Sequence, residues 1–101
     1  MASVMVAKVV EVPPGQGRVV QVGAKTLALF NVDGAFHAID NSCPHRGGPM
    51  GDGDLDGRIA ICPWHGWRWD VTTGSNANNP AVKTACFPTR IENGDVYVEL
   101  P

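Results

Sequence analysis

Hydrophobic and polar residues alternate with a period of two along both ends of the chain, which is typical of β-strands with one buried face. The alternation predicts strands at 4–12, 18–22, 26–31, 35–40, 58–61, 67–71, 89–92 and 95–100. In the last of these, Val96, Val98 and Leu100 share one face. No stretch long enough for a helix carries apolar residues at helical spacing. The pattern therefore predicts an all-β fold.

Turn residues divide the strands and separate the middle of the chain from its ends. Asp33-Gly34 and Asn93-Gly94 are dipeptides that favour two-residue hairpins. The segment 41–80 is rich in glycine, proline, asparagine and tryptophan, unlike both ends. The strands of the two ends are therefore expected to form a sheeted base, from which 41–80 extends as a looped subdomain.

Length and composition narrow the class of protein. A chain of 101 residues is expected to form one domain, 1–101, because two cores would each be too small. The net charge of −2 does not provide the excess of positive charge that favours binding to nucleic acid or to an anionic membrane surface. No apolar run approaches the roughly 18 residues of a membrane span, and no signal peptide is evident. A cytoplasmic location is expected, and three cysteines, an odd number, argue against a disulfide framework.

Four potential metal ligands lie in the middle segment. Cys43 and His45 form a C-x-H pair, and after sixteen residues Cys62 and His65 form a C-x2-H pair. Each cysteine is followed by a proline, which stiffens the loop and lowers the entropy lost when the ligands are fixed. Nearby glycines allow close backbone approach or positive φ. The two pairs therefore predict a metal site held by two loops.

Two kinds of metal fit two cysteines and two histidines. Zinc is one, because tetrahedral Cys2His2 sites are common structural zinc sites. Zinc fingers, however, usually pair like ligands, whereas each loop here supplies one thiolate and one imidazole. The mixed pairs favour a binuclear iron–sulfur centre in which the thiolates hold one iron and the imidazoles the other.

The complete motif, Cys43-Pro44-His45 and Cys62-Pro63-Trp64-His65-Gly66-Trp67, resembles the signature of Rieske [2Fe–2S] proteins. The resemblance implies one [2Fe–2S] cluster per chain, with Cys43 and Cys62 on one iron and His45 and His65 on the other. It also implies an antiparallel β-sandwich base that carries a two-loop cluster-binding subdomain. A third loop covers the cluster in many members, and Asn79-Pro80-Ala81 is the stretch that matches it.

Departures from the respiratory members of this family indicate which branch the chain resembles. Gly48 and Trp64 stand where those members have two further cysteines that form a disulfide. Trp67 and Trp69 stand where they have hydroxyl side chains that donate hydrogen bonds to sulfur. Imidazole ligation makes a cluster less negative and easier to reduce than an all-cysteine cluster. Fewer hydrogen-bond donors to the cluster sulfurs stabilise the reduced state less and so lower the reduction potential. We therefore expect a potential near the low end of the Rieske range of about −150 to +300 mV.

The resemblance is therefore to soluble, oxygenase-associated Rieske ferredoxins, which are electron carriers and not enzymes. A terminal oxygenase needs a second iron site, and His37 is the only histidine left to build one. The implied partners are a flavin-dependent NAD(P)H reductase and a non-haem iron oxygenase, which dock transiently at the cluster tip. An apolar rim is expected there, made of Pro44, Pro49, Met50, Trp64 and Trp67, although at least one of Trp67 and Trp69 is expected in the core instead.

Two alternatives stay open, a structural zinc-binding interaction module and a Rieske subunit of a larger redox complex. Among the other candidates, Cys86 is expected to be a buried strand residue and His37 a surface or hydrogen-bonded histidine. Arg46 is as well explained by solvation as by a contact with an acidic group. Asp52, Asp54 and Asp56 are expected in a solvated turn and not in a calcium site. Asp70 and Thr73-Gly74 are expected to form an ordinary turn.

Overall fold

Three antiparallel sheets make up the fold in the computed structural model, which describes all residues except 1, 24, 42–48, 64–65, 80 and 101. The strand orders are β1-β10-β9, β2-β3-β4-β8 and β5-β6-β7. The strands are β1 (Ala2–Lys8), β2 (Gly17–Val22), β3 (Lys25–Val32), β4 (Ala35–Asp40), β5 (Asp54–Asp56), β6 (Ile59–Ile61), β7 (Arg68–Asp70), β8 (Cys86–Phe87), β9 (Thr89–Glu92) and β10 (Asp95–Leu100), with 3₁₀ helices η1 (Val9–Glu11) and η2 (Met50–Asp52). The predicted all-β class is confirmed.

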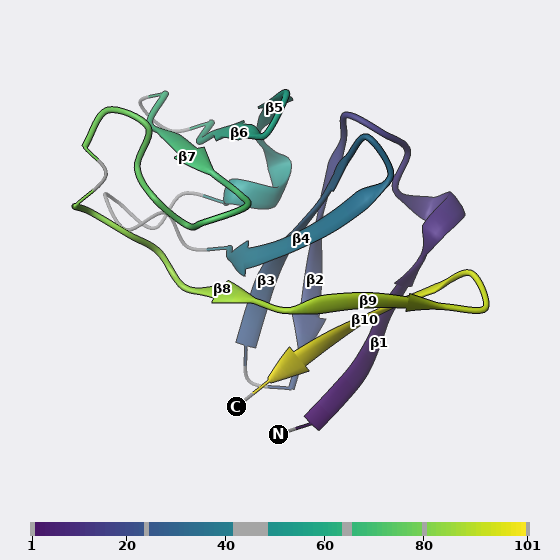
Figure 1. Cartoon of the computed structure of the whole chain (residues 1–101). Helices are drawn as coiled ribbons and strands as arrows, with labels where there is room; N and C mark the ends of the chain where they lie inside the picture. The colour runs from purple at the N-terminus through teal and green to yellow at the C-terminus, as the bar shows by residue number, and fades with distance from the viewer. Residues whose placement is uncertain (1, 24, 42–48, 64–65, 80, 101) are drawn as a thin grey trace.

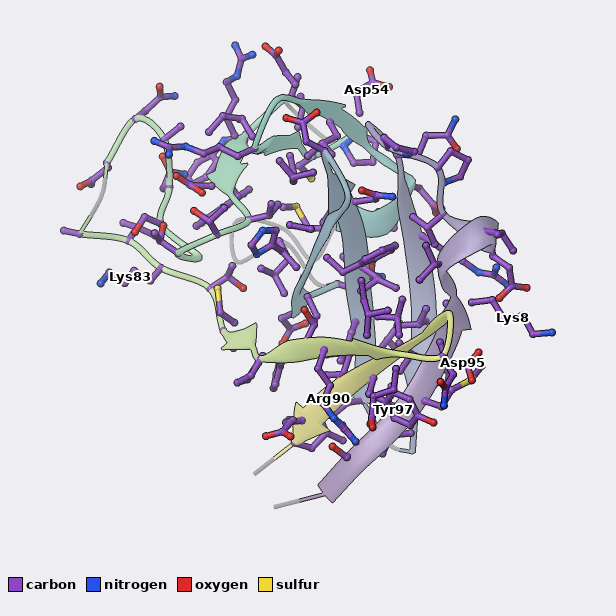
Figure 2. All side chains as sticks on the ribbon, turned by 45° about the vertical axis from the view of Figure 1, so that its right-hand side comes forward. Lys8, Asp54, Lys83, Arg90, Asp95 and Tyr97 are labelled. Carbon is purple, nitrogen blue, oxygen red and sulfur yellow. The ribbon has the colours of Figure 1, made fainter. Side chains whose placement is uncertain are left out.

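The first two sheets form the base and pack face to face. Their shared core takes residues from both sheets, including Leu27 and Leu29 of β3 and Val96 and Val98 of β10. Val96 and Val98 are fully buried, as the alternation of the last strand predicts. On the outer face of the first sheet the Arg90 guanidinium lies over the Tyr97 ring, at 4.6 Å from its centroid (Figure 2). We call the core between the two base sheets the base core.

A second core lies on the other side of β3. Its members include Ala28, Phe30 and Ile39 from the base, together with Met50, Ala60, Cys62, Trp69 and Val71. Consecutive residues of β3 thus point into different cores, because Leu29 faces the base core and Phe30 faces this one. We call it the subdomain core, because it joins the base to the small sheet β5-β6-β7 (Figure 1).

The turns follow their sequence signals. Asp33 and Gly34 both have positive φ, 52° and 94°, and Asn93 and Gly94 have φ of 51° and 81°. These angles are typical of the two-residue hairpins that the dipeptides predict, which join β3 to β4 and β9 to β10.

The segment between β4 and β8 leaves the base and returns to it at the neighbouring strand. Ala38 pairs with Phe87 and Ile39 with Cys86, and the Asp40 N–H donates to the carbonyl oxygen of Ala85 at 3.0 Å. Figure 1 shows β5, β6 and β7 at the end of the molecule far from both chain ends. The excursion therefore places its small sheet away from the termini.

The sequence misplaced some elements. The strand predicted at 4–12 ends at Lys8, because the chain turns into η1, where the Glu11 carboxylate accepts a hydrogen bond from the Lys8 N–H at 2.8 Å. That bond holds the pKa of Glu11 below its usual value. The aspartates expected in a solvated turn are exposed, but Asp54 and Asp56 belong to β5, and the Asp56 carboxylate forms a salt bridge with Arg68 of β7 at 3.2 Å.

No described helix has the length and apolar character that crossing a membrane requires.

Candidate metal centre

Cys62 is the predicted ligand that the structure describes; Cys43, His45 and His65 lie outside the described residues. Cys62 follows β6 directly and is 1% exposed, within the subdomain core. Among the described residues no three His, Cys, Asp or Glu side chains gather into a metal site. The structure therefore gives the position of one predicted ligand and of the segments that flank the other three.

The loop that begins at Cys62 is closed by a short backbone hydrogen bond. The Cys62 N–H donates to the carbonyl oxygen of Trp67 at 2.7 Å, so the loop spans 62–67. Gly66 has φ of 70°, a left-handed conformation that side chains other than glycine's rarely adopt. The positive φ expected for a glycine in this loop is thus confirmed at Gly66.

Asn41 joins the two flanks of the segment that carries Cys43 and His45. Its carbonyl oxygen accepts a hydrogen bond from the Met50 N–H, and its side-chain oxygen accepts one from the Gly51 N–H, both at 2.8 Å. Sequence reasoning missed Asn41, although an asparagine at the start of a glycine- and proline-rich segment is a known turn signal.

A third loop, which contains Asn76, Asn78 and Asn79, lies close to the loop that begins at Cys62. The Asn76 side chain is buried and its oxygen accepts hydrogen bonds from the N–H groups of Asn78 and Asn79, at 2.9 and 3.1 Å. A cavity of about 360 Å³ separates this loop from the loop that begins at Cys62. Its walls are Gly66, Trp67, Asn76, Asn78, Asn79 and Val82. The stretch predicted to cover the cluster thus lies, at Asn79, beside the second ligand loop.

The prediction that at least one of Trp67 and Trp69 lies in the core is confirmed. Trp69 is fully buried, and Trp67 is half-buried and stacks on it with ring centroids 6.2 Å apart. Met50 was expected at the rim, and that prediction is wrong. Met50 is fully buried in the subdomain core, because η2 packs against β2 and β3 and turns the side chain inward.

Cys86 and His37 lie in the base, on the paired strands β8 and β4, and not beside Cys62 in the subdomain core. Cys86 is in a strand as expected, but the prediction that it is buried is wrong. It is exposed, because β8 is a two-residue strand at the edge of its sheet. Partial burial of the sulfur, with the Asp70 carboxylate nearby, raises the pKa of the Cys86 thiol, which disfavours the reactive thiolate. His37 is half-buried in β4.

The turn expected at Asp70 and Thr73-Gly74 is confirmed. The Asp70 carboxylate accepts hydrogen bonds from the backbone and hydroxyl of Thr72, and its carbonyl oxygen accepts one from the Gly74 N–H at 2.7 Å. Gly74 has φ of 80°, and a Cβ there would press on the Thr84 carbonyl oxygen.

We expect Gly74→Ala to lower the free energy of unfolding more than Gly57→Ala does. Both glycines are left-handed, which costs an alanine about 1–2 kcal/mol, but a Cβ at Gly57 meets no atom within 4 Å. The crowding at Gly74 is expected to add about 1–3 kcal/mol. Urea denaturation of the two variants measures the difference, and equal losses would contradict this account of the turn at Gly74.

Comparison with known proteins gives a consistent result. The family model of the Rieske [2Fe-2S] domain matches residues 2–89. The ferredoxin component of a naphthalene 1,2-dioxygenase system from Pseudomonas aeruginosa is 40% identical over 91 residues, covering 89% of this chain and 88% of the relative.

Solved structures agree with the sequence relatives. The ferredoxin of Sphingomonas yanoikuyae B1 superposes with a TM-score of 0.89 at 32% identity, covering 99% of this chain and all of that one. A chain from a complex of reduced oxygenase and oxidised ferredoxin in carbazole 1,9a-dioxygenase superposes with a TM-score of 0.86 at 35% identity, covering 95% and 91% of the two chains.

Proposed function

Because the chain belongs to the Rieske [2Fe–2S] domain family, we propose that it carries one electron from a flavin-dependent NAD(P)H reductase to a non-haem iron oxygenase. The observation that carries this proposal is the near full-length match, in both chains, to a ferredoxin component of a dioxygenase system. The chain is thus an electron carrier and not itself an enzyme. A structural zinc module has no support from this family match.

The proposed cluster ligands are the four residues of the sequence motif. Cys43 and Cys62 would bind one iron through thiolates, and His45 and His65 would bind the other through ring nitrogens. When bound, such a cluster accepts and releases a single electron. The ligands belong to a proposed cluster-binding subdomain at about 41–80, within one domain that spans 1–101.

The described part of the site fits this cofactor. Cys62 offers a sulfur ligand in an apolar core, where the metal environment is dry and its charge is poorly screened. Asn41 and Asn76 tie the flanking loops by hydrogen bonds that involve no metal. The chain's own residues therefore position the ligands, exclude water on one side and leave the loop tips for electron exchange.

Docking of both partners is proposed at the loop tips, far from the chain ends. Pro63 and Gly66 are exposed and Pro49 is half-buried at this end of the molecule. The cytoplasm is the proposed compartment, because a reducing environment keeps cysteine thiols available as cluster ligands.

The purified protein is expected to be red-brown and, after reduction with dithionite, to give a rhombic electron paramagnetic resonance (EPR) signal of low average g. With NADH and a flavoprotein reductase of a naphthalene dioxygenase system, its visible absorption should bleach, and oxidised terminal oxygenase should restore it. A colourless protein that holds one zinc and stays silent by EPR would overturn the cluster and the carrier role together. A cluster that dithionite reduces but that passes no electron to any terminal oxygenase would overturn the carrier role alone.

A further inference from the structure

The indole nitrogen of Trp69 is a buried donor without an acceptor. Trp69 is fully buried, and its Nε1–H reaches no hydrogen-bond acceptor among the described residues. A buried donor left in this state costs about 1–3 kcal/mol, and native proteins keep such groups rare. The donor therefore calls for an acceptor that the polypeptide described here does not supply.

The strand register places Trp69 near Cys62, a proposed cluster ligand. In the antiparallel pair β6-β7, Trp69 lies opposite Ala60, and Cys62 is two residues further along on the same face. Trp69 and Cys62 are thus diagonal cross-strand neighbours, a spacing that an aromatic side chain can bridge. Both belong to the subdomain core.

The other side chains of this core offer no competing oxygen or nitrogen. The members of the core other than Trp69 are Ala28, Phe30, Ile39, Met50, Ala60, Cys62 and Val71. All are hydrocarbon side chains except for two sulfurs, and neither sulfur is within hydrogen-bonding geometry of Trp69 Nε1. None of the described side chains of this core supplies the acceptor, whereas the sulfurs of a cluster bound at Cys62 would do so.

We propose that Trp69 Nε1–H donates a hydrogen bond to a sulfur of the bound [2Fe–2S] cluster and thereby raises its reduction potential. This inference rests on the proposed function. Reduction adds negative charge to the cluster sulfurs, so a donor there stabilises the reduced state more than the oxidised state. Trp69 is a tuning residue, and it supplies one N–H where the sequence comparison with respiratory members finds hydroxyl groups missing.

The first test compares Trp69→Phe with Trp67→Phe in cluster-loaded protein. Both variants replace one member of the stacked pair with a smaller ring, but only the first removes the fully buried N–H that has no acceptor among the described residues. At a fixed ambient potential, we expect the reduced-to-oxidised ratio to fall about three- to tenfold in Trp69→Phe; tenfold corresponds to 59 mV for one electron. Dye-mediated reductive titration, followed by visible absorption, measures the ratio.

The control separates the hydrogen bond from loss of packing. The potential of Trp67→Phe should stay closer to that of the wild type than the potential of Trp69→Phe does. Equal shifts in the two variants, or an unchanged potential in a loaded Trp69→Phe protein, would overturn the inference and leave the carrier role intact. Wild-type protein without a cluster would instead overturn the proposed function.

A second measurement does not require Trp69→Phe to fold. Protein labelled with ¹⁵N in its indoles is reduced and studied by pulsed EPR, in the wild type and in a Trp64→Phe/Trp67→Phe double variant, in which Trp69 is the one indole left. A ¹⁵N coupling that survives in the double variant belongs to Trp69 and supports the hydrogen bond. Absence of coupling in the wild type, or its loss in the double variant, contradicts it.

Discussion

Cys62→Ser is expected to produce a protein without a cluster. Serine hydroxyl hardly ionises at neutral pH, and iron–sulfur centres select soft thiolates. Changes to residues that only support a metal ligand already weaken metal binding by about 10–100-fold, so loss of a ligand is expected to remove nearly all bound iron. The measurements are iron and sulfide content, visible absorption and the EPR signal after reduction.

Cys86→Ser is the matched control for this experiment. Cys86 is the other described cysteine and lies exposed on edge strand β8, so this variant should keep a full cluster. The unfolding temperature should fall for Cys62→Ser, because metal binding contributes to folding free energy. Retention of the wild-type spectrum by Cys62→Ser would contradict the ligand assignment.

Phe30→Ala is expected to lower the free energy of unfolding by about 3–5 kcal/mol, the usual cost of truncating a buried phenylalanine. Phe30 is fully buried in the subdomain core, where it holds the small sheet and Met50 against the base. A cavity there loosens the attachment of the ligand loops, so the cluster should also be lost faster under native conditions. Urea denaturation and the rate of bleaching in buffer measure the two effects.

Leu29→Ala separates stability from attachment. Leu29 is the preceding residue on β3 and is also fully buried, but it faces the base core. Its truncation is expected to cost about 2–5 kcal/mol with a much smaller effect on the bleaching rate. Equal bleaching rates in the two variants would show that the two cores respond as one unit.

A substitution at the exposed Val10 should change the free energy of unfolding by no more than about 0.5 kcal/mol.

The strands of the base could be predicted because their signals are local. Alternation and the positive-φ dipeptides Asp33-Gly34 and Asn93-Gly94 need only neighbouring residues to act. β5 and β8 were missed because Asp54-Leu55-Asp56 and Cys86-Phe87 are too short to show a period, and their pairing depends on strands distant in sequence. The early end of β1 depends on the Glu11 side chain in the same way.

The candidate site was predictable in its chemistry and less so in its surroundings. The spacing of the Cys and His pairs is visible in the sequence, and the ligand set drawn from it stays a prediction; the structure places Cys62 in the subdomain core. The burial of Met50 was not predictable, because it requires η2 to pack against strands that precede it by some 20 to 30 residues. The unsatisfied donor of Trp69 likewise appears only when the apolar residues around it are known.

The hydrogen bond between Asp40 and Ala85 has a consequence for how such proteins diversify. Because β4 and β8 are paired neighbours, the whole segment between them serves the base as one long connection between two antiparallel strands. Loop-closure entropy grows only slowly with length, so this connection can lengthen, shorten or exchange its content while the pairing of Ala38 with Phe87 is kept. The base can therefore tolerate changes in this connection as long as the β4–β8 pairs are kept and the new segment still covers the side chains that β3 and β4 direct into the subdomain core.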